Sequence, residues 1–550
     1  MKNSFILLLV IIIFTSCKKT EERQFVEIDS IIPKAIALSE EQQKNWQYKD
    51  IINDTIPGIS LNKAYNKIIK NRRGEEIIVA VLDTDPDINH EDLINNIWIN
   101  KDEIPNNNID DDGNGYIDDI NGWNFVSNAK GNSLTYVQME ETRILSKYNN
   151  YFEALDVISK KDKEKYELFK KADSSYRSII KETKNSISKY HKYKTIRQRA
   201  FKIVSEFLSD TIITIEKLDK IKTSDSIIIK NTKILNHAIK KNFDDDYFNK
   251  LIREKDSILE FCMNINYDTR IRINDDQDDI TDKKYGSPYL SQNINKLKHS
   301  TAMSGMIAAD RTNKIGLKGV TNNVKIMPLY FTAIGDYTDK DLSLAIKYAV
   351  DNGAKIINLS QGKSFSLNQN WVERAIKYAE SKNVLIVKAA GNDNLNIDKS
   401  DWFPKDQIGK NGKEFVQNVI TVGASTFFLN SKLKNNSSNY GKNNVDLFAP
   451  GYKVKALKPK NQYGIASGSS YSTAIVSGVA ALIRSHHPDL SAFEVKDILM
   501  KSGVSYDIDV EIKQEDGSKK LVPFSELSKS GKIVNAYNAL LMAEQISKSK

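Results

Sequence analysis

The chain has 550 residues, of which 80 are lysine or arginine, 71 are aspartate or glutamate, and 40% are hydrophobic. A chain of this length can bury a large core and can hold more than one structural unit. Its net charge of +9 is dispersed among acids and asparagines, which indicates a solvated surface and argues against a nucleic acid as partner. We expect a monomer that binds no nucleic acid.

The N-terminus has the pattern of a secretory signal peptide. A lysine precedes an apolar run over 5–14 that is too short to span a bilayer. The sequence FTSC follows and resembles a bacterial lipobox, in which cleavage leaves the cysteine as a lipid-modified N-terminus. We predict a lipoprotein signal peptide over 1–16, then a tether and lead-in over 17–55 that begins with acylated Cys17 and holds the protein on a bacterial membrane outside the cytoplasm. The alternative is an ordinary secretory signal with a chance cysteine.

Short apolar runs typical of buried strands recur along the chain. The run in 75–85 is rich in β-branched residues and ends in acids, as a buried parallel strand does at its carboxyl end. Similar runs lie at 324–331, 354–362, 383–392 and 418–425, and helical patterns lie between several of them, at 339–353 and 370–383. This alternation predicts an α/β fold with a mainly parallel sheet flanked by helices.

One block departs from this alternation. Between Gly131 and Gly286 the chain has no glycine or proline, and lysine, glutamate, isoleucine and tyrosine dominate. Apolar residues recur there at helical spacing, which predicts long amphipathic helices and argues against a disordered spacer. We therefore predict an inserted all-α helical subdomain over 129–286. We expect it to act as a lid over a neighbouring site, because it interrupts the strand and helix alternation; a partner-docking arm, a spacer and a solvated helical decoration remain alternatives.

Three segments contain candidate groups for nucleophilic catalysis. Ser470 in GSSYSTA heads a helix of small residues, where backbone amides and the helix dipole favour negative charge, although a helix-capping serine is the simpler alternative. His299 in KHSTAMSG heads another such helix. Asp83 ends the first predicted strand, at the edge of the sheet where open α/β folds place their sites.

These three segments resemble the catalytic motifs of the subtilase family of serine peptidases. Asp83 falls on the family's Asp-Thr-Gly motif, His299 on its His-Gly-Thr-His motif and Ser470 on its Gly-Thr-Ser-Met-Ala motif, in the family's order. AAGND resembles the oxyanion motif and implies that Asn392 is a donor, whereas INLSQG resembles the substrate-binding strand; the implied substrate-binding residues are Ser360, Gly362 and Gly391.

The resemblance implies a subtilisin-like three-layer fold and a serine endopeptidase that needs no cofactor for its chemistry. The catalytic domain would comprise 56–128 and 287–545, and peptides or proteins would be its substrates. Several neighbours of the triad depart from the family pattern, and among these are Asp85 in place of glycine, Ser300, Ala302 and Tyr471. None removes a catalytic group. The alternatives are a pseudoprotease that acts as a binding module and a subtilase with ligase or narrow maturation activity.

If Asp85 faces His299, it would raise the pKa of that histidine.

An acidic loop over 106–123 is a candidate calcium site. Its oxygens lie at spacings that resemble the start of a calcium loop, but Asn121 stands where an EF-hand has glutamate; the candidate ligands are Asp110, Asp112, Asn114 and Asp118. A solvated acidic turn is the alternative. A second acidic loop over 274–286 is a weaker candidate. If Cys17 is acylated, Cys262 has no cysteine with which to form an intramolecular disulfide.

Overall fold

The structure is a computed structural model that describes residues 25–27, 38–409, 412–514 and 516–550. The predicted signal peptide and Cys17 lie outside the described residues. In the described part of the chain, no helix combines the length and the apolar content needed to cross a membrane.

Within the described residues, the centre of the fold is a nine-stranded sheet of order β10-β13-β7-β6-β5-β4-β1-β3-β2. Its strands are β1 (Ile77–Asp83), β2 (Trp123–Asn124), β3 (Val324–Tyr330), β4 (Ile356–Leu359), β5 (Leu385–Ala389), β6 (Val419–Ser425), β7 (Leu447–Pro450), β10 (Val504–Ser505) and β13 (Lys532–Ile533). Every neighbouring pair is parallel except β10 with β13. Two hairpins lie outside this sheet, formed by β8 (Val454–Lys458) with β9 (Gln462–Ala466) and by β11 (Asp509–Lys513) with β12 (Lys519–Pro523).

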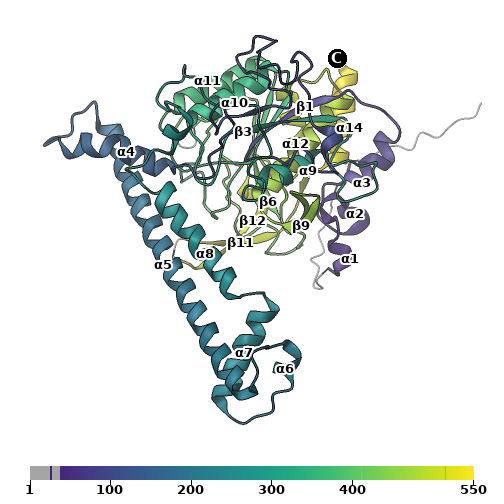
Figure 1. The fold of residues 1–550 in the computed structure, drawn as a ribbon. Helices are drawn as coiled ribbons and strands as arrows, with labels where there is room; N and C mark the ends of the chain where they lie inside the picture. Colours follow the sequence, from purple (N-terminus) through teal and green to yellow (C-terminus); the bar gives the residue numbers. More distant parts are fainter. Residues whose placement is uncertain (1–24, 28–37, 410–411, 515) are drawn as a thin grey trace, which may run out of the picture.

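Helices cover both faces of the sheet, so its strands are buried on both sides. Along β1, Val79 and Val81 belong to one core, whereas Ala80 and Leu82 belong to the other. The first core contains α9 (His299–Ala308), α12 (Ser469–His486), α13 (Ala492–Lys501) and α14 (Ala536–Ser549), and the second contains α10 (Asp339–Asp351) and α11 (Gln369–Ser381) (Figure 1). The prediction of an α/β fold with a mainly parallel sheet is confirmed.

The lead-in packs on this body before the first strand. Its elements are α1 (Glu40–Gln43), η1 (Trp46–Tyr48), α2 (Ile51–Asp54), α3 (Leu61–Ala64) and η2 (Tyr65–Ile69). Trp46 is fully buried, lies edge-on to Phe427, and donates its Nε1 proton to the carbonyl oxygen of Tyr452 over 2.9 Å. The described part of the segment predicted as a tether and lead-in therefore packs on the body, since Val26, Leu38 and Trp46 all belong to its core.

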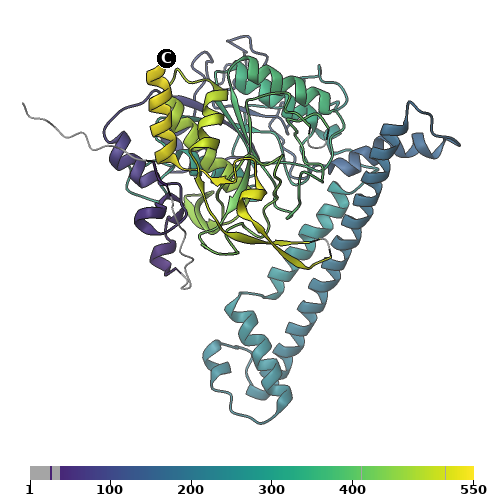
Figure 2. The same cartoon turned by 180° about the vertical axis from the view of Figure 1, so that it is seen from behind.

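A helical arm projects from the body between β2 and β3 (Figures 1 and 2). It comprises α4 (Glu140–Glu153), α5 (Lys163–Leu208), α6 (Ile215–Asp219), α7 (Ser226–Lys240), α8 (Asp245–Ser257), η4 (Ile258–Cys262) and η5 (Thr269–Ile273). With 46 residues, α5 is about 70 Å long. The segments on either side pack on the sheet, since Leu134, Val137 and Tyr285 belong to its core. The helical part is thus shorter than the predicted 129–286. Two further short helices in the body are η3 (Ile94–Asn96) and η6 (Phe524–Leu527).

Buried charges attach the first end of the arm to the body. At the start of α4, Glu140 forms ion pairs with Arg143 and, over 3.1 Å, with Lys363. Lys363 also pairs with Asp339 at the start of α10 over 2.9 Å. The carboxylate oxygen of Glu140 that faces Lys363 also accepts the backbone N–H of Leu367 over 2.8 Å. These contacts join α4 to the segment that follows the predicted substrate-binding strand.

The other end of the arm is also attached to α10. Arg270 in η5 is 2% exposed and pairs with Asp275 over 2.5 Å and with Asp341 of α10 over 2.8 Å. Its guanidinium lies 5.1 Å from the ring centroid of Tyr285, and Lys340 also pairs with Asp275. Both ends of the arm therefore meet at the N-terminus of α10.

Candidate active site

The carboxyl edge of the sheet holds an Asp–His pair. Asp83, the last residue of β1, is fully buried, and His299 is the first residue of α9. Nδ1 of His299 lies 2.8 Å from each carboxylate oxygen of Asp83, which also accepts the backbone N–H of Thr84 over 2.7 Å. The imidazole is 30% exposed, and its hydrogen bond to Asp83 fixes its tautomer and orientation.

The electrostatics of this pair favour a protonated imidazole. Burial lowers the pKa of His299, but the Asp83 charge and its hydrogen bond outweigh that effect, so the pKa is raised above its ordinary value of 6.5. A general base must be neutral to act, so we expect kcat/KM to rise with pH along an acid limb whose apparent pKa lies above 6.5. A profile of kcat/KM from acid to alkaline pH measures this limb, and a midpoint below the ordinary histidine value contradicts the assignment.

Asp85→Asn provides the control for that profile, because Asp85 also titrates nearby. Burial raises the pKa of Asp85 to about 6. Its carboxylate accepts the backbone N–H of Ser291 over 2.8 Å and that of Asn293, and Asp83 alone supplies the charge that raises the pKa of His299. The suggested contact of Asp85 with His299 is therefore absent among the described residues. The acid limb should persist in Asp85→Asn.

Ser470 lies at the start of α12, one residue after its first position. Its Oγ donates to the carbonyl oxygen of Ser360 over 3.1 Å, and Oγ of Ser360 donates back to the carbonyl oxygen of Ser470 over 3.1 Å. Ser360 is 4% exposed, and its side chain holds the backbone of Ser470. To be activated, the Ser470 hydroxyl must exchange its carbonyl partner for the free nitrogen of His299.

Asn392 lies beside the start of the same helix. Its Oδ1 accepts the backbone N–H of Ser469 over 2.8 Å, which leaves the Nδ2 protons of this exposed residue available. Gly391, directly before it, donates its N–H to Oγ of Ser469 over 3.2 Å. The backbone N–H of Ser470 lies in the first turn of α12, where no earlier turn can accept it. The arrangement offers two donors to the oxyanion that forms when Oγ of Ser470 attacks a carbonyl carbon.

The remaining predicted substrate residues flank an aromatic side chain. A Cβ on Gly362 or on Gly391 would come within 2.6 Å of the indole of Trp402. The structure thus brings together Asp83, His299, Ser470, Asn392, Ser360, Gly362 and Gly391 at one edge of the sheet.

Three neighbours of the triad were not predicted as site residues. Nε2 of Gln361 lies 3.4 Å from Nδ1 of His299. The ring of Tyr471 lies edge-on to His299 with the centroids 6.4 Å apart, and burial raises its pKa to about 12. The indole of Trp402 contacts Gly362 and Gly391. Tyr471 lies beside Ser470 and Gln361 lies inside INLSQG, so both have a signal in the sequence, whereas Trp402 lies outside these motifs and is brought in by the fold.

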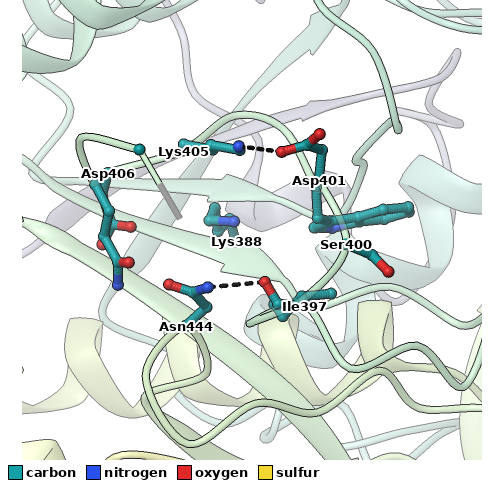
Figure 3. Close-up of a pocket in the computed structure, with 10 residues that line it drawn as sticks. Lys388, Ile397, Ser400, Asp401, Lys405, Asp406 and Asn444 are labelled. Carbon is teal, nitrogen blue, oxygen red and sulfur yellow. Dashed lines mark hydrogen bonds and ion pairs between the residues drawn. The ribbon is translucent and has the colours of Figure 1, made fainter. Parts of the chain in front are cut away.

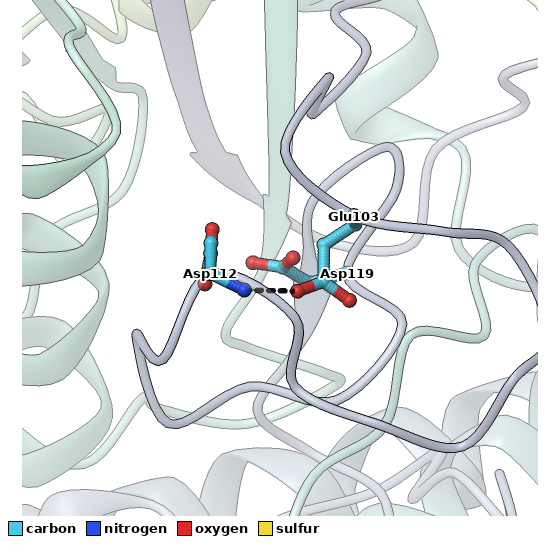
Figure 4. Close-up of side chains that lie close together, drawn as sticks. All are labelled: Glu103, Asp112 and Asp119. Carbon is cyan, nitrogen blue, oxygen red and sulfur yellow. Dashed lines mark hydrogen bonds between the residues drawn. The ribbon is translucent and has the colours of Figure 1, made fainter.

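The acidic loop places its carboxylates differently from the prediction. Glu103, Asp112 and Asp119 have ligand oxygens within 4.8 Å of one another (Figure 4). By contrast, Asp110 accepts the backbone N–H groups of the turn after it, and Asp118 accepts those of 107 and 108. Of the four predicted ligands, Asp112 is in the cluster, and Asn114 reaches it through Nδ2, which donates to Asp112 and Asp119. Glu103 and Asp119 were missed because they lie outside the loop pattern.

Comparisons with known proteins show which family the sequence matches. The sequence profile of the subtilase family matches residues 74–523. The chain is 32% identical over 239 residues to the cell wall-associated protease of Bacillus subtilis (strain 168), an alignment that covers 43% of this chain and 24% of that protein. It is 34% identical over 188 residues to the thermophilic serine proteinase of Bacillus sp. (strain AK1), covering 34% of this chain and 42% of that protein.

Among solved structures, the subtilase cytotoxin SubAB assembly contains a chain that is 27% identical, with a TM-score of 0.37, and the match covers 48% of this chain and 81% of that one. This chain spans less than half the length of the two curated relatives. The family profile, however, covers more than half of the 550 residues. The chain therefore belongs to the subtilase family.

Proposed function

We propose that the protein is a serine endopeptidase that hydrolyses peptide bonds through an acyl-enzyme. The observation that carries this proposal is the placement of the Asp83–His299 pair, Ser470 and Asn392 at one edge of the sheet. His299 takes the proton of the Ser470 hydroxyl as its oxygen attacks the scissile carbonyl, and Asp83 stabilises the imidazolium. Asn392 Nδ2 and the Ser470 N–H donate to the oxyanion. His299 then protonates the leaving amine, and water releases the acyl group.

Labelling with a fluorophosphonate probe tests this proposal directly. The probe reacts with a serine only when a base activates it. We expect the purified protein, expressed from residue 18 without its lipid anchor, to be labelled at Ser470 and to cleave a peptide library. A folded wild type that is not labelled would favour the pseudoprotease alternative, in which the fold and its arm only bind a partner.

We also propose that the protein is anchored by acylated Cys17 to a bacterial membrane, outside the cytoplasm. The support is the lipobox-like FTSC and the apolar run before it. An alkyne fatty acid fed to expressing cells should be incorporated into the full-length protein and not into Cys17→Ser. Equal incorporation into both proteins would show that Cys17 is not the residue that carries the lipid.

We propose a structural calcium ion at Glu103, Asp112 and Asp119, which is the donor chemistry that calcium prefers. Burial raises the pKa of Asp119 to about 6, so a cation there would stabilise its ionised form. Calcium should raise the Tm of the Ser470→Ala protein, and Asp112→Asn should abolish that rise. Asp111→Asn is the control, because Asp111 accepts from Ile104 and Asn107 instead. An equal Tm with calcium and with chelator means that the loop is a solvated acidic turn.

The arm contributes a wall to the substrate cleft in this proposal. A groove of about 340 Å³ lies between the start of α5 and the catalytic body, lined by Lys163, Glu164, Glu167, Leu168, Lys171, Ser364, Phe365, Asp401 and Phe403. Phe365 lies three residues beyond Gly362. An extended peptide advances about 3.3 Å per residue, so one paired along 360–362 reaches this groove with a residue about four or five positions before the scissile bond.

Leu168→Asp is expected to lower kcat/KM for a six-residue unprimed peptide roughly tenfold while leaving a three-residue peptide unchanged, because it places a charge in the groove's apolar part. Steady-state kinetics on the matched pair measure the ratio. Ile212→Asp is the control, since Ile212 is 68% exposed in the segment between α5 and α6. A loss shared equally by both peptides would show that the groove is not a subsite.

A further inference from the structure

The indole of Trp402 occupies the gap between two backbone segments of the active site. A Cβ atom added to Gly362, or one added to Gly391, would lie 2.6 Å from atoms of its ring, so the ring contacts both glycines directly. Gly362 ends the segment that begins at Ser360, and Gly391 precedes Asn392. The indole therefore lies one residue from the oxyanion donor on one side and two residues from the nucleophile's carbonyl partner on the other.

This side chain is held in place from both ends. Its Nε1 donates to the carbonyl oxygen of Ala389, at the end of β5, over 3.1 Å. The next residue, Phe403, exchanges two backbone hydrogen bonds with Lys363: Phe403 N–H donates over 2.8 Å and Lys363 N–H donates over 3.2 Å. The chain around Trp402 is thus fixed against the segment that contains Gly362, while the residue itself is half-buried.

The chemistry of acyl transfer says which part of a substrate this gap would receive. The acyl carbon must bond to Oγ of Ser470 while its oxygen points toward Asn392. The residue that supplies this carbon, P1, then has its Cα beside the segment from Ser360 to Gly362. Its side chain either enters the gap between Gly362 and Gly391 or turns to solvent. The gap already contains an indole.

The indole also borders a small cavity. Trp402 contributes to the wall of a cavity of about 20 Å³ whose lining includes Lys388, Ile397 and Asp406 (Figure 3). Burial lowers the pKa of Lys388 to about 8 and raises that of Asp406. Loss of the indole would leave the gap between Gly362 and Gly391 open to a P1 side chain.

We propose that Trp402 closes the P1 subsite, so that the protein cleaves after small residues such as glycine, alanine and serine. This inference rests on the proposed peptidase function and adds a determinant of its specificity. Two glycines and one tryptophan act together here: the glycines have no Cβ to occupy the gap, and the indole fills it in their place. A large P1 side chain would have to displace the ring and break the hydrogen bond from its Nε1 to the carbonyl oxygen of Ala389.

Peptides that differ only at P1 test the inference. In the wild type, kcat/KM with alanine at P1 should exceed that with phenylalanine by at least tenfold, and Trp402→Ala should raise the phenylalanine-to-alanine ratio by roughly 10–200-fold. Trp402→Phe, which keeps a ring but loses the Nε1 donor, should fall between them. Fluorophosphonate titration of active sites normalises each rate, so protein that fails to fold does not enter the ratio.

Two results would overturn the inference alone. One is a labelled wild type that accepts phenylalanine at P1 as well as alanine. The other is a labelled Trp402→Ala whose ratio equals that of the wild type, which would mean that the P1 side chain lies elsewhere. Absence of labelling in a folded wild type is a different failure, because it removes the proposed function and this inference with it.

Discussion

Ser470→Ala and His299→Ala are each expected to lower kcat by about a millionfold, the size that such replacements reach in a subtilisin-type triad. Ser470 supplies the attacking oxygen, and His299 supplies the base that Asp83 orients over 2.8 Å. Because the two side chains act in one step, the double variant should lose no more than either single variant. Burst and steady-state kinetics on a peptide ester measure the loss, and residual turnover reports the oxyanion donors alone.

Ser472→Ala is the matched control for the nucleophile. Ser472 lies on the same helix, is fully buried, and donates to the carbonyl oxygen of Ala449 over 2.8 Å. Its loss should change activity far less than loss of Ser470, since it has no contact with the pair. Ser469→Ala separates the two adjacent serines, because Oγ of Ser469 accepts the N–H of Gly391. Labelling that persists in Ser470→Ala and disappears in Ser469→Ala would show that Ser469, and not Ser470, is the nucleophile.

The parts of the site that could be predicted are those whose signal is local. The β-branched run that forms β1 ends at Asp83, and a parallel strand must deliver its last side chain to the carboxyl edge. His299 and Ser470 lie at the starts of helices whose small residues pack in the core against the sheet. In each case the strand or helix and the reactive side chain lie within one short segment, so the pattern predicts both.

The parts that could not be predicted depend on contacts between distant segments. Trp402 enters the site only because Phe403 pairs with Lys363 across the cleft. Asp119 joins Glu103 and Asp112 because the loop folds back on itself, whereas Asp118, one residue earlier, turns to backbone amides. Two adjacent aspartates therefore differ in role, one facing the carboxylate cluster and the other accepting backbone amides of the turn. The spacing of acids in the sequence does not predict which aspartate does which. The same holds for Asp85, whose partners lie more than 200 residues away.

Arg270→Ala is expected to destabilise the protein by about 3–5 kcal/mol, the cost of leaving a buried carboxylate without its partner. Burial lowers the pKa of Arg270, but the charges of Asp341 and Asp275 outweigh that effect and raise it, so the guanidinium stays ionised. Its removal takes the charged partner from Asp341, which is 1% exposed, whereas Asp275 keeps its ion pair with Lys340. Urea denaturation of the Ser470→Ala protein, which cannot digest itself, measures the change; tryptophan fluorescence is a suitable signal because Trp123 packs beside Gly286.

A second Arg–Asp pair in the arm separates burial from charge. Arg177 pairs with Asp173 over 2.8 Å but is 76% exposed, so water replaces the lost partner and Arg177→Ala should leave stability unchanged within error. Equal effects of the two variants would mean that Arg270 does not hold the arm. Because Arg270 pairs with Asp275 and Asp341 and not with the triad, Arg270→Ala should retain fluorophosphonate labelling below its unfolding transition. It should nevertheless lose the advantage of long peptides, since the groove needs α5 in position against Phe365 and Phe403.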